Sequence, residues 1–451
     1  MVSLPAVTPR LYSSDEVEYF SYLRSLYFDR DVSFENEYQY FYDHNIAESA
    51  AFHETFLERS TAVGRRVNYA TIGAAILWLP FYAIADGWTR LSGAADPDGF
   101  SKPYLAAVAY GSAFYAFLAV LLSLRAARLL TRPAAPDAGR EDPASLFAAL
   151  AVWLGTPLLF YMYVAPPFSH ACSAFAVAVF VNVWLRVRRQ WSTGGALALG
   201  ICAAVMTMVR EQDAFIALGP AVDFVWSARW RAGASLTAQV RAALGGLAGF
   251  LLGYLPQFLA YDALNGYPGP AEHVSRKMYW YAPHALDVLF SPHHGFFFWT
   301  PIALFAIGGL FAVRDRRIAT CLLIMVASQI YIAGSVESWT VAGAFGQRRF
   351  VCLTPILVVG LTDLVAFVLG RDRIADRFRL KIAAGVVMTL CVWWNVALMA
   401  QFATRLMDRQ RLEPARNAYH AFVTLPRMAP SLAWRYLVDR DSFYESGGAH
   451  R

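Results

Sequence analysis

The sequence predicts an all-α polytopic membrane protein with about ten to eleven transmembrane helices, and three observations predict that class. Of the 451 residues, 57% are hydrophobic, 15% are aromatic and only 16% are charged, whereas about a quarter of the residues of ordinary soluble domains are charged. The mean hydropathy is +0.38. Apolar runs of bilayer-spanning length cover most of the chain. These properties exclude a soluble multidomain protein.

The charge pattern gives little support for nucleic-acid binding, and the cysteine pattern gives little support for disulfides or a metal site. The 39 basic and 33 acidic residues leave a formal net charge of +6. The arginines are spread in small groups between apolar runs, without the long basic stripe that nucleic-acid binding needs. The five cysteines all fall inside apolar runs and show no CxxC spacing. Buried packing residues, rather than disulfides or metal ligands, have this distribution.

The first hydrophilic stretch, residues 1–68, contains eleven acidic residues, six arginines and many tyrosines and phenylalanines. Disordered segments seldom carry so many aromatic residues, so we expect this region to fold. A basic n-region followed by an apolar h-region is missing from its first 60 residues, and the sequence therefore predicts no signal peptide.

Eleven apolar segments follow, each bounded by charge or by Pro and Gly. They lie at about 69–88, 103–124, 146–165, 168–185, 194–209, 213–228, 240–261, 295–313, 318–334, 350–369 and 382–402. The first is short, contains Pro80 and is rich in aromatic residues. This composition suits an interfacial or re-entrant element at least as well as a span. The other ten are predicted to cross the membrane.

The basic residues of the loops predict the orientation. One alternating set of loops holds 18 basic residues, in Arg125–Arg140, Arg186–Arg189, Arg229–Arg241, Arg314–Arg317 and Arg371–Lys381. The other set, at 86–102, around 166, and at 210–213, 262–294 and 335–349, holds seven. The first set is predicted to be cytoplasmic. Residues 403–451 are then extracytoplasmic and 103–402 form the transmembrane domain. If the 69–88 segment spans the membrane, residues 1–68 are cytoplasmic; if it does not, residues 1–102 are extracytoplasmic, which is the interpretation we favour. An extracytoplasmic start needs an upstream span, so we expect upstream sequence to encode a further apolar segment of about 20 residues.

A carboxylate motif stands near the start of the N-terminal region. The run from Ser14 to Tyr19 predicts a helix start, with Asp15 and Glu16 in the first turn and a serine as N-cap. A carboxylate close to the membrane can accept the proton of an attacking hydroxyl or hold a divalent cation. The plainer alternative is a solvated, capped helix start.

Four basic residues are candidates for binding a phosphate at the same face. Arg210 lies between two apolar runs, where a functional role or an ion pair with a neighbouring acidic residue would account for its charge. Arg348 and Arg349 lie at the mouth of another span, and Lys277 lies in the 262–294 loop. For these three the alternative is a flanking residue that extends towards the membrane interface.

Candidate sugar contacts lie in the same predicted outer regions. His170 follows two prolines at a span boundary and could contact a sugar or a metal, or could be a hydrogen-bonded structural histidine. Glu337 and Trp339 together offer a carboxylate and an aromatic face, which suit sugar hydroxyls and C–H groups. Tyr19 completes the group, one helical turn beyond Asp15 and Glu16.

Five motifs follow one another along most of the chain. They are the DExxY segment Asp15–Tyr19, the proline-containing segment Gly73–Tyr82, Pro166–His170, Leu289–Gly295 with Trp299–Pro301, and Trp339 with Gly343–Arg349. In this order, the motifs resemble the GT-C superfamily of integral-membrane glycosyltransferases. The sequence departs from the family at its start, because the family has a spanning helix before the acidic loop.

The resemblance implies a hexosyl- or pentosyltransferase that uses a polyprenyl-phosphate-linked sugar as donor and inverts the anomeric configuration. The acceptor would be a hydroxyl of a glycan, lipid or protein. Asp15 would be the general base, and Glu16 its neighbour or its partner on a Mg or Mn ion. The arginines with Lys277 would bind the donor phosphate. The site would face the extracytoplasmic side of a bacterial inner membrane, in glycosylation of the cell envelope.

A transporter or flippase for a lipid-linked or small polar substrate is the alternative function. Transport predicts inverted repeats and charged or broken helices near the midplane. Neither feature is evident in the sequence. All nine histidines fall in regions predicted to lie outside, so the polar residues gather at one face of the membrane. A non-catalytic membrane scaffold is a third interpretation, but it leaves the outer carboxylates and arginines unexplained.

Overall fold

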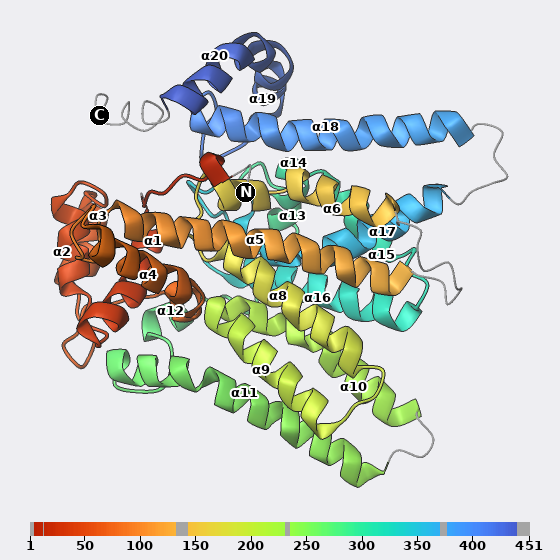
Figure 1. Ribbon diagram of the computed structural model, residues 1–451. Helices are drawn as coiled ribbons and strands as arrows, with labels where there is room; N and C mark the ends of the chain where they lie inside the picture. The colour runs from red at the N-terminus through yellow and green to blue at the C-terminus, as the bar shows by residue number, and fades with distance from the viewer. Residues whose placement is uncertain (1–3, 12, 132–142, 231–234, 370–376, 440–451) are drawn as a thin grey trace.

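The computed structural model describes residues 4–11, 13–131, 143–230, 235–369 and 377–439, which form helices and connecting loops (Figure 1). Across these ranges there is no β-strand, and extended segments pair only at single bridges, one of which joins Met278 to Val336. The predicted all-α polytopic class is confirmed.

The N-terminal region folds into short helices around a cluster of buried aromatic side chains. Helix α1 begins at Ser14 because Ser13 and Glu16 form a reciprocal capping box: each side chain accepts a hydrogen bond from the other's amide, at 3.4 and 3.1 Å. Phe20 packs edge-on against Phe41 at 5.5 Å between ring centroids. The elements are η1 (Leu4–Ala6), α1 (Ser14–Arg24), η2 (Ser25–Asp29), α2 (Glu35–Asp43), α3 (Ala50–Phe52) and η3 (His53–Glu58).

Helix α4 (Gly73–Ser92) carries the 69–88 segment and connects this region to the bundle. Its first residue touches the end of another helix, since a Cβ on Gly73 would lie 2.3 Å from the carbonyl carbon of Met208. Buried Asp86 accepts a hydrogen bond from Tyr104 at 2.6 Å. Among the described residues, α4 is not one of the helices both long and apolar enough to cross a membrane. Its interfacial or re-entrant placement stays a prediction.

The rest of the chain forms the helical bundle and a C-terminal cap. The first half contains α5 (Lys102–Thr131), α6 (Pro143–Gly155), α7 (Leu158–Tyr163), α8 (His170–Val187), α9 (Thr193–Val209), η4 (Glu211–Ala217), α10 (Leu218–Trp230) and α11 (Leu236–Asn265). The second half contains α12 (Glu272–Arg276), α13 (Asp287–Phe290), α14 (Phe296–Trp299), α15 (Ile302–Leu310), α16 (Arg316–Ser335), η5 (Arg348–Leu353), α17 (Thr354–Leu369) and α18 (Arg377–Ala403). The cap contains α19 (Pro414–Tyr419), η6 (His420–Thr424) and α20 (Leu425–Val438).

Six helices in the described ranges are long and apolar enough to cross a membrane: Lys102–Thr131, His170–Val187, Leu236–Asn265, Arg316–Ser335, Arg348–Val368 and Phe378–Ala403. Other predicted spans differ from a single long helix. The 146–165 segment divides into α6 and α7 at Pro157, and the 295–313 segment divides into α14 and α15 at Pro301. Proline interrupts a helix because it lacks an amide hydrogen and crowds the preceding turn.

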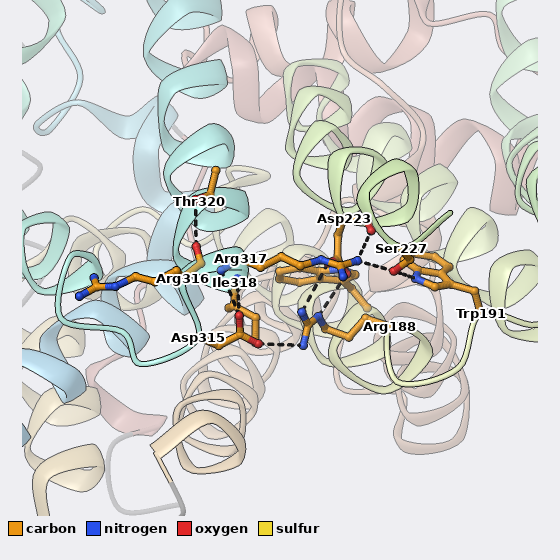
Figure 2. A network of polar contacts seen from close by, with 10 residues as sticks. Arg188, Trp191, Asp223, Ser227, Asp315, Arg316, Arg317, Ile318 and Thr320 are labelled. Atoms are coloured by element: carbon orange, nitrogen blue, oxygen red, sulfur yellow. Dashed lines mark hydrogen bonds and ion pairs between the residues drawn. The ribbon is translucent and has the colours of Figure 1, made fainter. Parts of the chain in front are cut away.

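The bundle has two polar ends. Figure 1 shows α1 to α4 gathered at the end where α5 begins and α11 finishes. At the opposite end, arginines from two predicted cytoplasmic loops meet one buried carboxylate, as Figure 2 shows. Arg188 Nε lies 3.1 Å and Arg317 Nε 2.5 Å from the two oxygens of Asp223, which also accepts the Trp184 indole N–H at 3.0 Å. This cluster joins α8, α10 and the start of α16.

Candidate active site

A cavity of about 570 Å³ lies where the N-terminal region meets the ends of α8, α9 and α16. Asp15 and Tyr19 of α1 contribute to its wall, as do Tyr69 and Thr71 from the loop before α4. The beginning of α8, the residues around η4, the loop that contains α12 and the start of η5 complete it. Segments far apart in the sequence therefore converge on one site.

Two apolar segments begin as 3-10 turns at this cavity. Arg210 has extended backbone, with φ −154° and ψ 118°, and separates α9 from η4, while η5 begins at Arg348. The Gln212 side-chain amide donates to the Arg349 carbonyl at 3.1 Å, and that of Gln329 donates to the Gln212 carbonyl at 3.0 Å. Non-helical backbone at membrane depth is tolerated where it is satisfied in this way and lines a cavity. The two breaks bring three arginines to one wall.

Asp15 forms an ion pair with Arg348 inside the cavity. The Oδ2 to Nη1 distance is 2.8 Å, and the two side chains are 42% and 22% exposed. The Arg348 guanidinium also lies over the ring of Phe168, 5.3 Å from its centroid. The carboxylate predicted to be the general base is thus accessible from the cavity and oriented by one of the predicted phosphate ligands.

The other predicted cations lie on the same wall but differ in their contacts. Arg210 contacts the ring of His170, and both residues line the cavity. Arg349 lines it too, but its guanidinium donates to the Ser338 carbonyl and hydroxyl at 2.8 and 3.0 Å. Lys277 completes the set from the loop that contains α12. The wall therefore carries more basic than acidic groups, a suitable environment for an anion.

Glu16 is not part of this wall. Its side chain is buried, and Oε2 accepts the Ser13 amide in the capping box that starts α1. Asp15 and Glu16 therefore do not face the cavity together as ligands of one ion. Within the described ranges, no group of three or more His, Cys, Asp or Glu residues is placed to hold a metal. The alternative interpretation of the sequence, a capped helix start, accounts for the position of Glu16.

Of the four predicted sugar contacts, two line the cavity and two do not. Tyr19 and His170 line the cavity, and the Tyr19 ring packs edge-on against Trp78 at 6.4 Å. Glu337 and Trp339 lie outside the wall. The Trp339 ring stacks on His284 at 5.0 Å, and the Glu337 amide donates to the Lys277 carbonyl at 2.8 Å. The structure therefore does not bring Glu337 and Trp339 together with Asp15.

Sequence reasoning missed two residues that hold the site together. Glu18 is buried one turn after Asp15 and accepts the Tyr69 amide at 2.7 Å. Burial, and next the charge of Asp15, raise the pKa of Glu18 to about 8. Thr71 donates to the Val209 carbonyl at 3.0 Å, at the end of α9. The i, i+3 spacing from Asp15 to Glu18 was a visible signal for the first, whereas nothing in the local sequence marks Thr71.

The fold that the sequence motifs predict, that of the GT-C type, is confirmed at the level of the fold by comparison with solved structures. Among solved structures, it is similar to ArnT from Cupriavidus metallidurans bound to undecaprenyl phosphate. The two chains are 16% identical with a TM-score of 0.51, and the match covers 98% of this chain and 76% of that one. No protein-family model and no curated protein sequence matches the chain.

Proposed function

We propose that this protein transfers a hexose or pentose from a polyprenyl-phosphate donor to an acceptor hydroxyl, with inversion, in the cavity that contains Asp15. The observation that carries the proposal is the presence of Asp15 and several basic side chains on the same cavity wall. Glu211 also lines the cavity, but its carboxylate accepts the Tyr261 hydroxyl. The fold similarity to a protein bound to undecaprenyl phosphate supports a donor of this class.

In the proposed reaction, the acceptor oxygen attacks the anomeric carbon as its proton passes to Asp15. The bond between the anomeric carbon and the phosphate oxygen breaks, and the lipid phosphate leaves with the electron pair. One carboxylate is sufficient for this single displacement, whereas retention would need a second, nucleophilic one. Arg210, Arg348 and Lys277 stabilise the charge that develops on the leaving phosphate. Arg348 contacts Asp15 in the structure and so adjoins both reacting groups.

A binding and turnover measurement tests this function. The purified protein in nanodiscs is titrated with undecaprenyl phosphate and its thermal unfolding is followed, and it is then incubated with undecaprenyl-phosphate-linked hexoses and pentoses. We expect thermal stabilisation by undecaprenyl phosphate and its release from at least one of the linked sugars. The absence of both effects would contradict the proposal. Movement of an intact linked sugar across a vesicle membrane, without release of undecaprenyl phosphate, would favour a flippase.

We also propose that the cavity faces the extracytoplasmic side of a bacterial inner membrane. The support is the arginine excess of the opposite loops, two of which contribute to the Asp223 cluster. Single cysteines at Glu48 and Gly194, in a variant without the five native cysteines, test this with a membrane-impermeant maleimide on spheroplasts. Glu48 is exposed, and a side chain at Gly194 meets no atom within 4 Å. We expect labelling at position 48 only; labelling at 194 only would reverse the orientation.

A further inference from the structure

The contact between His170 and Arg210 differs from the other arginine contacts described above. His170 is the first residue of α8 and only 3% exposed. Its Nδ1 atom lies within hydrogen-bonding distance of the Nη1 atom of Arg210. Arg210 is the residue at which the backbone turns from α9 into η4. A guanidinium has N–H donors and no acceptor. Nδ1 must therefore accept, so the ring is the neutral tautomer with its proton on Nε2.

Aromatic neighbours fix the position of this ring. The Phe168 ring stacks on His170 at 5.6 Å with an interplanar angle of 22°, and Tyr161 packs edge-on at 4.4 Å. Tyr161 is itself held, because its hydroxyl donates to the Phe345 carbonyl at 3.2 Å. The imidazole is therefore a rigid acceptor rather than a mobile side chain.

Because the His170 ring is neutral, it does not compensate the positive charge of Arg210. At the other end of the bundle, Arg188 and Arg317 share the buried carboxylate of Asp223, which compensates their charge (Figure 2).

Among the described residues, Arg210 forms no ion pair within 4 Å. The acidic groups closest in sequence accept hydrogen bonds from other residues: Glu211 from the Tyr261 hydroxyl, and Asp213 from the Ser173 hydroxyl at 2.6 Å. Asp213 is near enough to interact with the charge of Arg210, but it forms no ion pair with it. A carboxylate in place of His170 would orient Arg210 equally well, but it would cancel the charge that attracts an anion.

We propose that His170 is a positioning residue that directs the Arg210 guanidinium at the leaving phosphate without adding a carboxylate that would pair with its positive charge. This inference rests on the proposed function, because it takes the anion in the cavity to be a lipid phosphate. It differs from a direct sugar or metal contact, which is one of the two roles that the sequence allows for His170. The essential feature is a neutral acceptor at the position of Nδ1.

Substitutions at position 170 separate the position of the acceptor from its charge. The Asn side-chain oxygen falls near Nδ1, whereas the end of a Gln side chain falls near Nε2. The affinity for undecaprenyl phosphate, measured in nanodiscs, should fall less than about threefold in His170→Asn and about tenfold or more in His170→Gln. His170→Asp has the shape of His170→Asn but adds a negative charge, and it should also lose about tenfold or more. Equal losses in the Asn and Gln variants, or an Asp variant as good as Asn, would overturn the inference.

A double-mutant cycle tests whether His170 acts through Arg210. If it does, His170→Gln should add less than about twofold to the loss already caused by Arg210→Gln. An undiminished effect in the Arg210→Gln background would mean that His170 meets the ligand itself, which would also overturn the inference. Wild-type affinity in Arg210→Gln itself would instead remove the phosphate site that the proposed function needs. Thermal unfolding verifies each fold; if the Gln variant is unfolded, the isosteric Asn and Asp pair still decides.

Discussion

Replacement of Asp15 and of Glu16 separates catalysis from helix capping, because the structure places these neighbouring carboxylates in different environments. Asp15→Asn keeps the size of the side chain but removes the basic oxygen. Loss of a general base costs roughly 100-fold to 10,000-fold in transfer rate. The ion pair with Arg348 is partly exposed, at 42% and 22%, so its loss should cost about 1 kcal/mol or less of stability.

Glu16 should behave in the opposite way. Its Oε2 accepts the Ser13 amide in the capping box, and a glutamine at this position can make the same bond. Glu16→Gln should therefore retain both stability and transfer, whereas Glu16→Ala should lose about 1 kcal/mol of stability and keep its transfer rate per folded molecule.

The assay compares thermal unfolding, undecaprenyl phosphate binding and sugar release for all three variants in nanodiscs. A folded Asp15→Asn protein with wild-type transfer would remove Asp15 as the base. A Glu16→Gln protein that folds and binds undecaprenyl phosphate but transfers as poorly as Asp15→Asn would show that both carboxylates take part in the chemistry, for example on one cation.

Three further substitutions test other parts of the structure. Lys277→Gln removes one charge from the cavity wall and should weaken undecaprenyl phosphate binding by about two- to tenfold at low salt and less at high salt. The pKa of Glu18, raised to about 8 by burial and then by the Asp15 charge, means that the folded protein keeps a proton that the unfolded chain releases near pH 4.5. Wild-type thermal stability should therefore fall as the pH rises towards about 8, and Glu18→Gln, which stays neutral, should show a smaller fall. Asp223→Asn leaves Arg188 and Arg317 without their buried carboxylate and should cost about 3 kcal/mol in thermal unfolding, with transfer per folded molecule retained.

Much of the fold could be predicted because the length of an apolar run and the residues that cap or break a helix are local properties of the sequence. The apolar runs indicated the helices, and a serine N-cap followed by Asp15 and Glu16 indicated the start of α1. The divisions at Pro157 and Pro301 were also visible as prolines inside apolar runs. Each proline leaves two short helices in place of one span, and this arrangement needs packing that restores the lost backbone hydrogen bonds. The periodicity of hydrophobic residues in the sequence does not predict such packing.

The site could be predicted only as a set of residue types at one end of the bundle. Asp15 and Arg348 are separated by most of the chain, and neither local pattern indicates their ion pair. Trp339 was selected because an aromatic ring suits a sugar, yet its ring stacks on His284 outside the cavity wall. A motif indicates which groups are present, but the direction of each side chain depends on tertiary contacts.

The general base Asp15 and the phosphate-binding residue Arg210 of the proposed mechanism belong to two parts of the fold. The connection between these parts helps to set their separation, together with the ion pair between Asp15 and Arg348. Asp15 lies on α1, whereas Arg210 lies at the break between α9 and η4. The loop at 68–72 joins these parts: it donates to Glu18 of α1, to the last carbonyl of α9 through Thr71, and to a side chain of α11. Displacement by even 1 Å between base and leaving group costs a large fraction of the rate. These buried hydrogen bonds therefore matter for catalysis as well as for stability, although none of their donors carries a charge.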